Sequence, residues 1–246
     1  MNAEEYAVMY RVEDFHWWYL GMETITRQVI ERYYPRGSKL RILDAGCGTG
    51  AVMGYLADYG TVSGLDYSSK ALRFCRERQR KRLTQASVVA LPYPAAVFDL
   101  IASFDVVCVF DGEDDAPPLR EFARVLAPGG RVILRLPATP WLHGQHDVAV
   151  DVRQRYTTRE VDAKLRAAGL EPEQVTYANT LLFPLAVAKR LSERLLPAQD
   201  GSDLTLGMGP FNGLLRIVLA AEAPLVARCG LPFGLTVVAL ARKPSA

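Results

Sequence analysis

The sequence predicts an α/β fold with a doubly wound, seven-stranded sheet, and three observations lead to this prediction. Short apolar runs alternate with amphipathic stretches, which is typical of a parallel sheet flanked by helices. The first apolar run, residues 40–46, ends in the glycine-rich stretch LDAGCGTG. The second run, residues 61–67, carries Asp66, about 20 residues beyond the first glycine, where nucleoside-binding folds place an acidic residue.

The remaining elements follow in chain order. Residues 1–38 are expected to be helical, ending at Pro35 and Gly37. We expect strands at residues 40–46, 61–67, 86–90, 98–107, 131–136, 173–178 and 235–242. We expect helices at residues 51–60, from Ser68 or Ser69 to Leu83, from Pro117 to Leu126, and from Thr157, which forms a capping box with Glu160, to Gly169. Four regions result: a helical extension (1–38), the core (39–180), a helical insertion (181–230) and the last strand (231–246).

Composition excludes several classes of function. The 246 residues carry 29 basic and 27 acidic side chains, so the net charge of +2 gives no general attraction for nucleic acid. The four cysteines form no Cys-x-x-Cys pair, which predicts neither a metal site nor disulfides and indicates a reducing, cytoplasmic setting. The N-terminal residues lack the layout of a signal peptide, and no uncharged apolar run is long enough to span a bilayer.

The glycine-rich stretch defines the expected ligand. Gly46, Gly48 and Gly50 leave room for a ligand to approach the backbone where the first strand ends. Asp44, just ahead of them, would repel a phosphate but attract a cation. Asp66 can accept hydrogen bonds from both hydroxyls of a ribose. The expected ligand therefore has a ribose and a positive charge, and it lacks phosphate.

From residue 40 to about residue 170 the chain resembles the class I S-adenosylmethionine-dependent methyltransferases, which have a Rossmann-like fold. The motifs that carry the resemblance are LDAGCGTG, LPYPAAVFDLI and LREFARVLAPGGRVIL. It implies S-adenosylmethionine as cofactor and S-adenosylhomocysteine as product. The residues that it implies around the methionine part of the cofactor are Asp44, Ala45, Gly46, Cys47 and Gly48.

The same resemblance implies contacts with the rest of the cofactor. Asp66 would hold the ribose, and Tyr67 would lie along the adenine. Ser87, with Val88 beside it, stands where the family usually has an acid facing the adenine amine. Phe104 and Asp105 end the fourth strand, which faces the transferred methyl group.

Candidate catalytic residues come from the loop after the fifth strand. Many small-molecule methyltransferases have Leu-Glu-His where this chain has Val107, Cys108 and Val109, so no general base is expected there. The loop after the fifth strand resembles a motif of bacterial methyltransferases, His-Asp followed by His-x-Arg-Arg-Tyr-Thr. This chain has Val152 where the motif has its second histidine. The matching residues are His146, Asp147, Arg155, Tyr156 and Thr157. His146 and His143 are the candidate bases, and the alternative is that these motif residues only fix the loop.

The N-terminal segment HWWYLGM resembles a signature of the same bacterial enzymes. It implies a helical lid over the cofactor, with Tyr19 near the methionine end, where aromatic rings attract a sulfonium. Leu20 replaces the family's arginine, so Arg27 is a candidate partner for the cofactor carboxylate.

The apolar insertion, residues 181–230, could roof the acceptor site, form a dimer interface or lie on a membrane surface, and we expect the roof.

These observations predict methyl transfer to a small, fairly apolar acceptor, such as a secondary metabolite. The protein is expected to be a cytoplasmic biosynthetic enzyme, either monomer or homodimer, without a metal ion. Two alternatives stay open. One is an intramolecular displacement or cyclisation that consumes the cofactor and releases methylthioadenosine. The other is a protein that binds the cofactor without catalysis.

Overall fold

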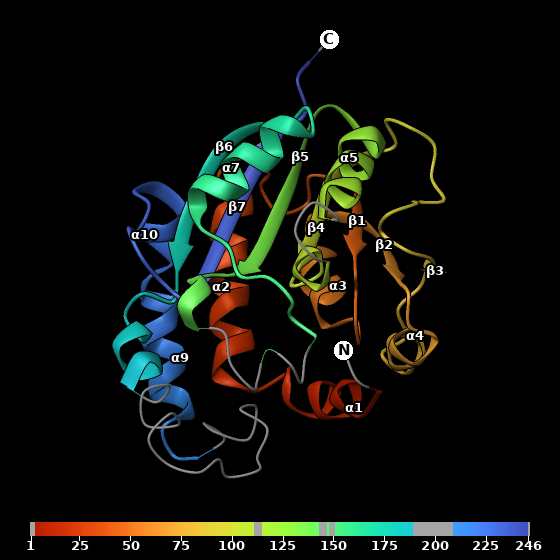
Figure 1. The fold of residues 1–246 in the computed structure, drawn as a ribbon. Coiled ribbons are helices and arrows are strands. Elements are labelled where there is room, and N and C mark those ends of the chain that lie inside the picture. Colours follow the sequence, from red (N-terminus) through yellow and green to blue (C-terminus); the bar gives the residue numbers. More distant parts are fainter. Residues whose placement is uncertain (1–2, 111–114, 143–146, 148–150, 189–208, 246) are drawn as a thin grey trace.

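The computed structural model describes residues 3–110, 115–142, 147, 151–188 and 209–245. Within them, one seven-stranded sheet has the order β3-β2-β1-β4-β5-β7-β6, as Figure 1 shows. The strands are β1 (Leu40–Ala45), β2 (Gly60–Asp66), β3 (Leu83–Gln85), β4 (Phe98–Phe104), β5 (Leu126–Pro137), β6 (Glu171–Ala178) and β7 (Thr236–Arg242). The predicted α/β, doubly wound fold is confirmed.

The last strand departs from a purely parallel sheet. β7 lies between β5 and β6 and runs antiparallel to both. Its first residue, Thr236, pairs with Pro137 at the end of β5 and with Ala178 at the end of β6. The chain therefore re-enters the sheet at the edge where β6 leaves it, and β7 has to run back in the opposite direction.

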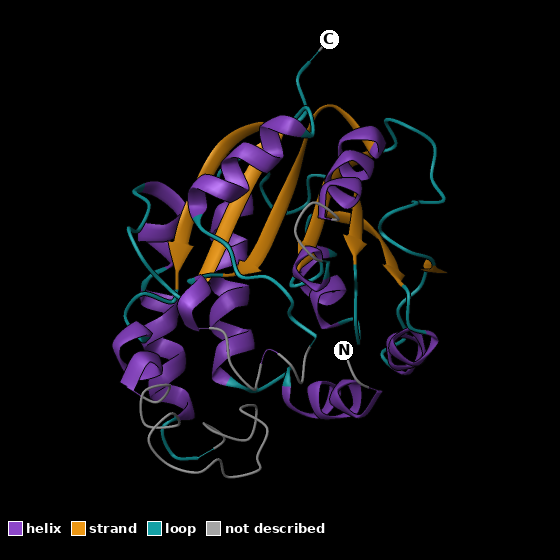
Figure 2. Cartoon of the chain, in the orientation of Figure 1, coloured by secondary structure: helices purple, strands orange, loops and turns teal. Residues whose placement is uncertain are grey.

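Helices cover both faces of the sheet, as Figure 2 shows. One face packs against α5 (Ala116–Val125), α7 (Thr158–Ala167) and the short helix η1 (Val107–Val109). The other packs against α2 (Trp17–Glu31), α3 (Ala51–Leu56), α4 (Ser69–Glu77), α9 (Asn212–Ala221) and α10 (Ala223–Arg228). A further short helix, η3 (Pro140–Leu142), follows β5, and α1 (Ala3–Val12) lies at the carboxyl ends of the central strands. None of the described helices is both long and apolar enough to cross a membrane.

The N-terminal region divides into two parts with different surroundings. In α2, Met22 and Ile25 are fully buried in the same hydrophobic cluster as Ile42 of β1 and Leu219 of α9. This helix is part of the core layer, and the insertion packs against it. Of the lid predicted for residues 1–38, α2 is thus part of the core, and α1 remains as the candidate lid. That α1 acts as a lid stays a prediction.

Side chains at the helix starts fix where these elements begin. Thr157 and Glu160 form the predicted capping box of α7, and the Ser68 hydroxyl accepts a hydrogen bond from Ala71 N (3.2 Å) at the start of α4. At α2, His16 Nδ1 accepts a hydrogen bond from Trp18 N (3.3 Å). The histidine of HWWYLGM thus starts the helix that presents the two tryptophans.

The third strand differs from the prediction. It occupies Leu83–Gln85, pairing with Gly64–Asp66, whereas residues 88–90 form a turn and a bend. Val88 is buried in the core from that turn. The apolar residues that indicated a strand at 86–90 therefore belong to a turn in which Val88 is buried and Val89 is exposed, and a short apolar run alone does not distinguish such a turn from a strand.

Candidate active site

The glycine-rich loop follows β1 directly and lies at the carboxyl edge of the sheet. Gly46 N and Cys47 N both donate to Leu65 O, at 2.7 and 2.9 Å, which ties the loop to β2. Gly46 has φ of 88°, and a Cβ there would lie 2.1 Å from Val106 Cγ2. Any side chain at this position would clash, so the glycine is required by both backbone conformation and space.

Asp44 is buried at the end of β1 with part of its carboxyl group unpaired. Its Oδ2 has no hydrogen-bond partner among the residues that the structure describes. Burial, together with the negative charges of Asp66 and Glu13, raises the pKa of Asp44 to about 8, and the positive charge of Arg135 opposes the shift. A buried carboxyl group without a partner is costly unless a ligand supplies a donor or a cation. The ammonium of S-adenosylmethionine meets that need, so the residues present fit this cofactor.

Asp66, at the end of β2, is already held by the backbone. Its Oδ2 accepts from Gly48 N (2.9 Å) and its Oδ1 from Ser68 N (2.8 Å). Burial is the main cause that raises its pKa, and these two hydrogen bonds oppose that shift. A carboxylate has about four acceptor sites, so each oxygen keeps one for a ribose hydroxyl. The geometry therefore matches the role that the resemblance implies.

The residues expected at the adenine end lie in different environments. Tyr67 is 80% exposed directly after β2, which leaves its ring open to a ligand. Ser87 lies in the loop after β3, and its hydroxyl accepts from Val89 N (3.4 Å). Val88 is 6% exposed and belongs to the hydrophobic cluster on the side of the sheet that α5 and α7 cover. Of the three, Val88 has the least surface to offer to an adenine.

Helix α1 lies across the glycine-rich loop. A Cβ on Gly48 would lie 2.9 Å from Met9 Cε, so the two are in close contact. Tyr6 lies beside Ser68 and Asp66, and burial together with the Asp66 charge raises the pKa of Tyr6 to about 12. Glu13, just after the helix, accepts a hydrogen bond from the Thr49 hydroxyl. α1 thus covers the loop and Asp66 in this structure.

A charged pair with aromatic neighbours lies at the carboxyl ends of β4 and β5, and it joins Asp105, an expected site residue, to Arg135, which the sequence analysis missed. Arg135 Nε and Nη2 both contact Asp105 Oδ2 at 2.8 Å. The guanidinium lies over the rings of Trp18 and Phe104, 4.7 Å from each ring centroid. Asp105 has φ of 58°, an uncommon conformation for a residue other than glycine that often marks functional sites.

Tyr19 of α2 lies close to this pair. Burial raises its pKa, as do the charges of Glu13 and Asp105, whereas Arg135 lowers it. Arg27, the predicted partner of the cofactor carboxylate, points elsewhere. It pairs with Glu23 (2.8 Å) and with Asp58 (2.7 Å), which precedes β2 at the amino-terminal end of the sheet. The assignment of Arg27 to the cofactor was therefore wrong.

The loop after β5 is fixed by buried polar contacts. Arg155 forms a two-pronged pair with Asp147, at 2.7 and 3.1 Å, and donates to Ala138 O. The Tyr156 hydroxyl donates to Asp115 (3.0 Å). These contacts fit the alternative that the motif residues hold the loop in place. His143 and His146 lie outside the described residues, so their catalytic role stays a prediction.

Two cysteines that are distant in sequence meet at the glycine-rich loop. Cys47 Sγ and Cys75 Sγ are 3.8 Å apart, and the Cys75 thiol also donates to Gly48 O (3.2 Å). Neither contact involves a metal cluster, since no group of three or more candidate ligands occurs among the described residues. The thiols therefore help to pack the loop.

Comparison with known proteins agrees with this geometry. A family of methyltransferase domains matches residues 43–134. The 27-O-demethylrifamycin SV methyltransferase of Amycolatopsis mediterranei is 33% identical over 216 residues, which cover 75% of this chain and 77% of that protein. The chain belongs to the class I S-adenosylmethionine-dependent methyltransferases. As a member of this family it is an enzyme, rather than the non-catalytic protein considered above.

Two further relatives show how widely the methyltransferase fold is shared. A fatty-acid O-methyltransferase of Mycolicibacterium smegmatis is 28% identical over 160 residues, covering 61% of this chain and 52% of that protein. The crystal structure of an S-adenosylmethionine-dependent methyltransferase from Mesorhizobium loti superposes with a TM-score of 0.56 at 19% identity, covering 87% of this chain and 95% of that one. The second likeness concerns the fold alone.

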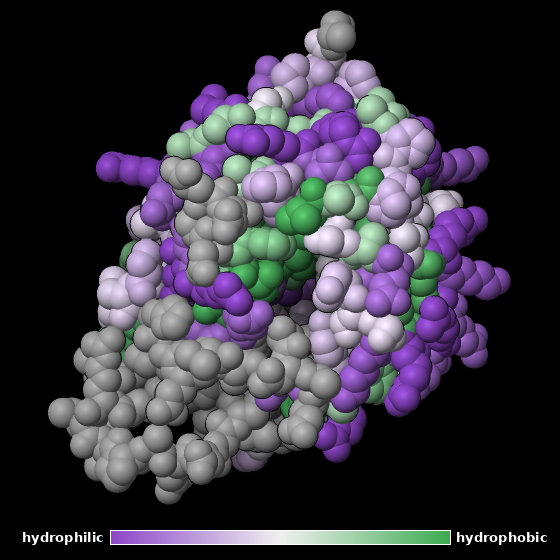
Figure 3. All heavy atoms as spheres, turned by 45° about the vertical axis from the view of Figure 1, so that its right-hand side comes forward, coloured by the Kyte–Doolittle hydropathy of each residue, from purple (hydrophilic) through white to green (hydrophobic). Residues whose placement is uncertain are grey.

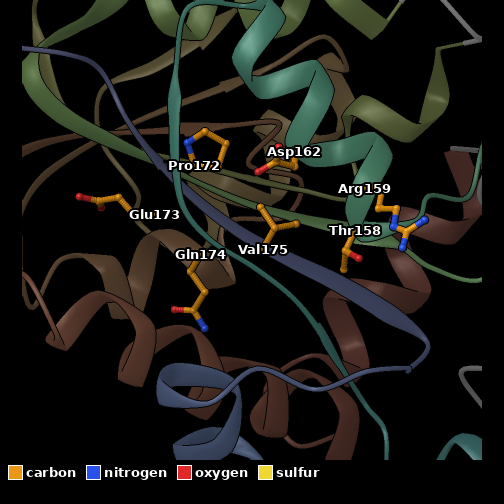
Figure 4. Close-up of a pocket in the computed structure, with 7 residues that line it drawn as sticks. All are labelled: Thr158, Arg159, Asp162, Pro172, Glu173, Gln174 and Val175. Atoms are coloured by element: carbon orange, nitrogen blue, oxygen red, sulfur yellow. The ribbon is translucent and has the colours of Figure 1, made fainter.

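A separate groove of about 410 Å³ lies between α7 and β6, as Figure 4 shows. Its lining residues are Thr158, Arg159, Asp162, Pro172, Glu173, Gln174 and Val175. β6 is the edge strand furthest from β1 and β2 in the order of the sheet. The groove is therefore distinct from the candidate cofactor site at the ends of those two strands.

Proposed function

We propose that this methyltransferase transfers a methyl group from S-adenosylmethionine to a small, fairly apolar acceptor in a biosynthetic pathway of the cytoplasm. The observation that carries the proposal is the unpaired buried carboxyl oxygen of Asp44 beside the glycine-rich loop, with Asp66 at the next strand end. Such an arrangement accommodates a ligand with a cation and a ribose but no phosphate.

The bound cofactor supplies an activated methyl group on its sulfonium. The chain's own residues bind and orient it. Asp44 would accept the ammonium, Asp66 would accept the ribose hydroxyls, and the backbone of the glycine-rich loop would lie against the ligand. Helix α1 excludes water from above, since Met9 lies on Gly48 and Tyr6 lies near Asp66.

An aromatic cluster at the same edge of the sheet supports an apolar acceptor. Trp141 follows β5, Phe183 follows β6 and Phe233 precedes β7, and these ends meet at Thr236. The ring centroids are 6.2 Å apart for Trp141 and Phe183, and 5.4 Å apart for Phe183 and Phe233. Trp141 is 56% exposed, so the cluster offers apolar surface. Hydrophobic residues also gather beside a hollow on the face seen in Figure 3.

After β4, Val107, Cys108 and Val109 stand where many small-molecule methyltransferases have Leu-Glu-His, so that glutamate and histidine are missing from these positions. Val107 and Cys108 are buried in η1, and burial raises the pKa of the Cys108 thiol well above its usual range. The chain can still promote transfer by holding the acceptor in line with the methyl group and away from water. Relatives named for O-methylation of a rifamycin precursor and of fatty acids support an oxygen acceptor.

The test is product analysis with the purified protein, S-adenosylmethionine and a panel of hydroxylated polyketides and fatty acids. Methylated acceptor together with S-adenosylhomocysteine is the expected result. Methylthioadenosine formed without any acceptor would instead show intramolecular displacement. Trp141→Ala should raise the KM for the acceptor at least tenfold and leave that for the cofactor unchanged, whereas equal effects on both would contradict the assigned acceptor surface.

A further inference from the structure

A second charged group faces the cofactor region from β5. Asp44 pairs in register with Ala102 of β4, and Phe104 pairs with Arg135 of β5. Ile42, Ala102, Phe104 and Ile133 all belong to the hydrophobic cluster between the sheet and α2. Side chains alternate between the two faces along a strand, so Asp44, two residues after Ile42, and Arg135, two residues after Ile133, face that same side. Asp44 and Arg135 are thus an anion and a cation on one face of the sheet, at its carboxyl edge.

The side chain of Arg135 extends from β5 towards β1. Its guanidinium lies over Phe104 and is bonded to Asp105, and both belong to the carboxyl end of β4, the strand between β5 and β1. Ordinary sheet spacings place the Cα atoms of Asp44 and Arg135 about 12 Å apart. The long arginine side chain covers much of that distance, and the gap that remains is suited to a small amino-acid group.

The guanidinium of Arg135 is held in place, but not all of its N–H groups have a hydrogen-bond partner among the described residues. Nε and Nη2 contact one oxygen of Asp105, while Nη1 has no hydrogen-bond partner among the described residues. The rings of Trp18 and Phe104 hold its plane in place. A fixed guanidinium edge is suited to a carboxylate, which it can bind through two parallel hydrogen bonds.

We propose that Arg135 binds the carboxylate of the amino-acid part of S-adenosylmethionine while Asp44 accepts its ammonium. This inference rests on the proposed function, because it assigns one end of the same cofactor. It also gives the carboxylate a partner in a chain that has Leu20 where the resemblance expects arginine and whose Arg27 is paired at the other end of the sheet.

The test uses binding calorimetry with three ligands: S-adenosylhomocysteine, its decarboxylated analogue and methylthioadenosine, which lacks both the ammonium and the carboxylate. Arg135→Met should weaken S-adenosylhomocysteine about ten- to hundredfold and leave the decarboxylated analogue within about twofold. Asp44→Asn should weaken both amine-bearing ligands and spare methylthioadenosine. Arg135→Lys, which keeps the charge, should recover part of the affinity.

Arg131→Met is the matched control. Arg131 lies on the same strand and face, is paired with Glu173 (2.6 Å) and lies over the ring of Tyr33, but it is near the other end of the sheet. Its replacement should leave the binding of all three ligands unchanged.

The outcomes separate the two proposals. If Arg135→Met weakens S-adenosylhomocysteine and the decarboxylated analogue equally, or weakens neither, Arg135 serves only the fold and the inference is overturned. If the unmodified protein binds none of the three ligands, the proposed function itself fails. Should Arg135→Met not fold, Arg135→Lys and the ligand preference of the unmodified protein still decide. Equal affinity of the unmodified protein for the first two ligands would contradict any carboxylate contact.

Discussion

Asp44 and Asp66 end adjacent strands, yet their carboxyl groups have different surroundings. Asp66 accepts two backbone hydrogen bonds, whereas one oxygen of Asp44 has no partner within the described part of the chain. Asp66 is therefore held by the fold before any ligand arrives. Asp44 is the residue whose state a ligand changes most, because its pKa of about 8 leaves it largely protonated near neutral pH.

Cofactor binding should release a proton from Asp44. An ammonium beside this carboxyl group favours its ionised form and lowers its pKa, so a group that is neutral in the free protein becomes charged in the complex. Affinity for S-adenosylhomocysteine should therefore rise as the pH increases towards about 8 and weaken as the pH falls. Calorimetry in two buffers of different ionisation enthalpy measures the proton count directly.

Asp44→Asn is the control for that experiment, since the amide cannot titrate. The variant should bind more weakly, with a heat that no longer depends on the buffer. The same heat in both buffers for the unmodified protein would show that Asp44 is already ionised, or that the ammonium binds elsewhere.

At the scale of elements, Arg78 at the end of α4 is one of the residues that attach α1 to the rest of the molecule. Arg78 bonds Glu13 and Asp14, each at 2.9 Å, and its guanidinium lies 4.7 Å from the centroid of the Tyr10 ring. Tyr10 in turn stacks on Phe74. One side chain thus connects the helix over the glycine-rich loop to the helix that follows Asp66.

Arg78→Met should loosen α1 while the core stays folded. Loss of charge-assisted hydrogen bonds of about 1–3 kcal/mol should speed amide hydrogen exchange in residues 3–12 roughly ten- to hundredfold. Dissociation of S-adenosylhomocysteine should be faster as well. Arg73→Met, on the exposed side of α4, is the matched control, because Arg73 interacts within its own helix, through a 3.5 Å pair with Glu77 and with the Phe74 ring, whose centroid is 5.9 Å away. Unchanged exchange in the Arg78 variant would contradict the lid role of α1.

The packing of α2 against α9 depends on a glycine. A Cβ on Gly21 would lie 2.6 Å from Leu219 Cδ2, and Leu219 is fully buried. Gly21→Ala should therefore lower the free energy of unfolding by about 1–3 kcal/mol through overpacking, as measured by urea denaturation. Gly213→Ala on α9, where nothing lies within 4 Å, should leave stability the same or slightly higher. Equal effects of the two changes would count against close packing of these helices.

At the scale of the whole molecule, the sheet gathers residues from most of the chain at one edge. The carboxyl ends of four strands supply the residues of the candidate site, which are Asp44 from β1, Asp66 from β2, Asp105 from β4 and Arg135 from β5. Asn212 of α9 accepts from Trp17 N (2.8 Å) and donates to Phe15 O (2.9 Å), which ties the insertion to the start of α2. The tryptophans of HWWYLGM are therefore placed by contacts almost 200 residues away in sequence.

The features that the sequence could predict are local ones. The glycine-rich loop and Asp66 depend on strand ends and a fixed spacing, both of which are visible in the sequence. Arg135 could not be predicted, because it looks like any charge within an apolar run until α2 brings Trp18 against it. The direction of β7 was also hidden, since an apolar run fits a parallel or an antiparallel strand equally well.

The most direct test of the central claim is a calorimetric titration of S-adenosylhomocysteine into the unmodified protein and into Asp66→Ala, with unfolding curves of both. We predict saturable one-to-one binding with a dissociation constant below about 1 mM, and a loss of about 1–3 kcal/mol in the folded variant. Absence of binding at millimolar ligand, or unchanged affinity in Asp66→Ala, would contradict a cofactor site at the ends of β1 and β2.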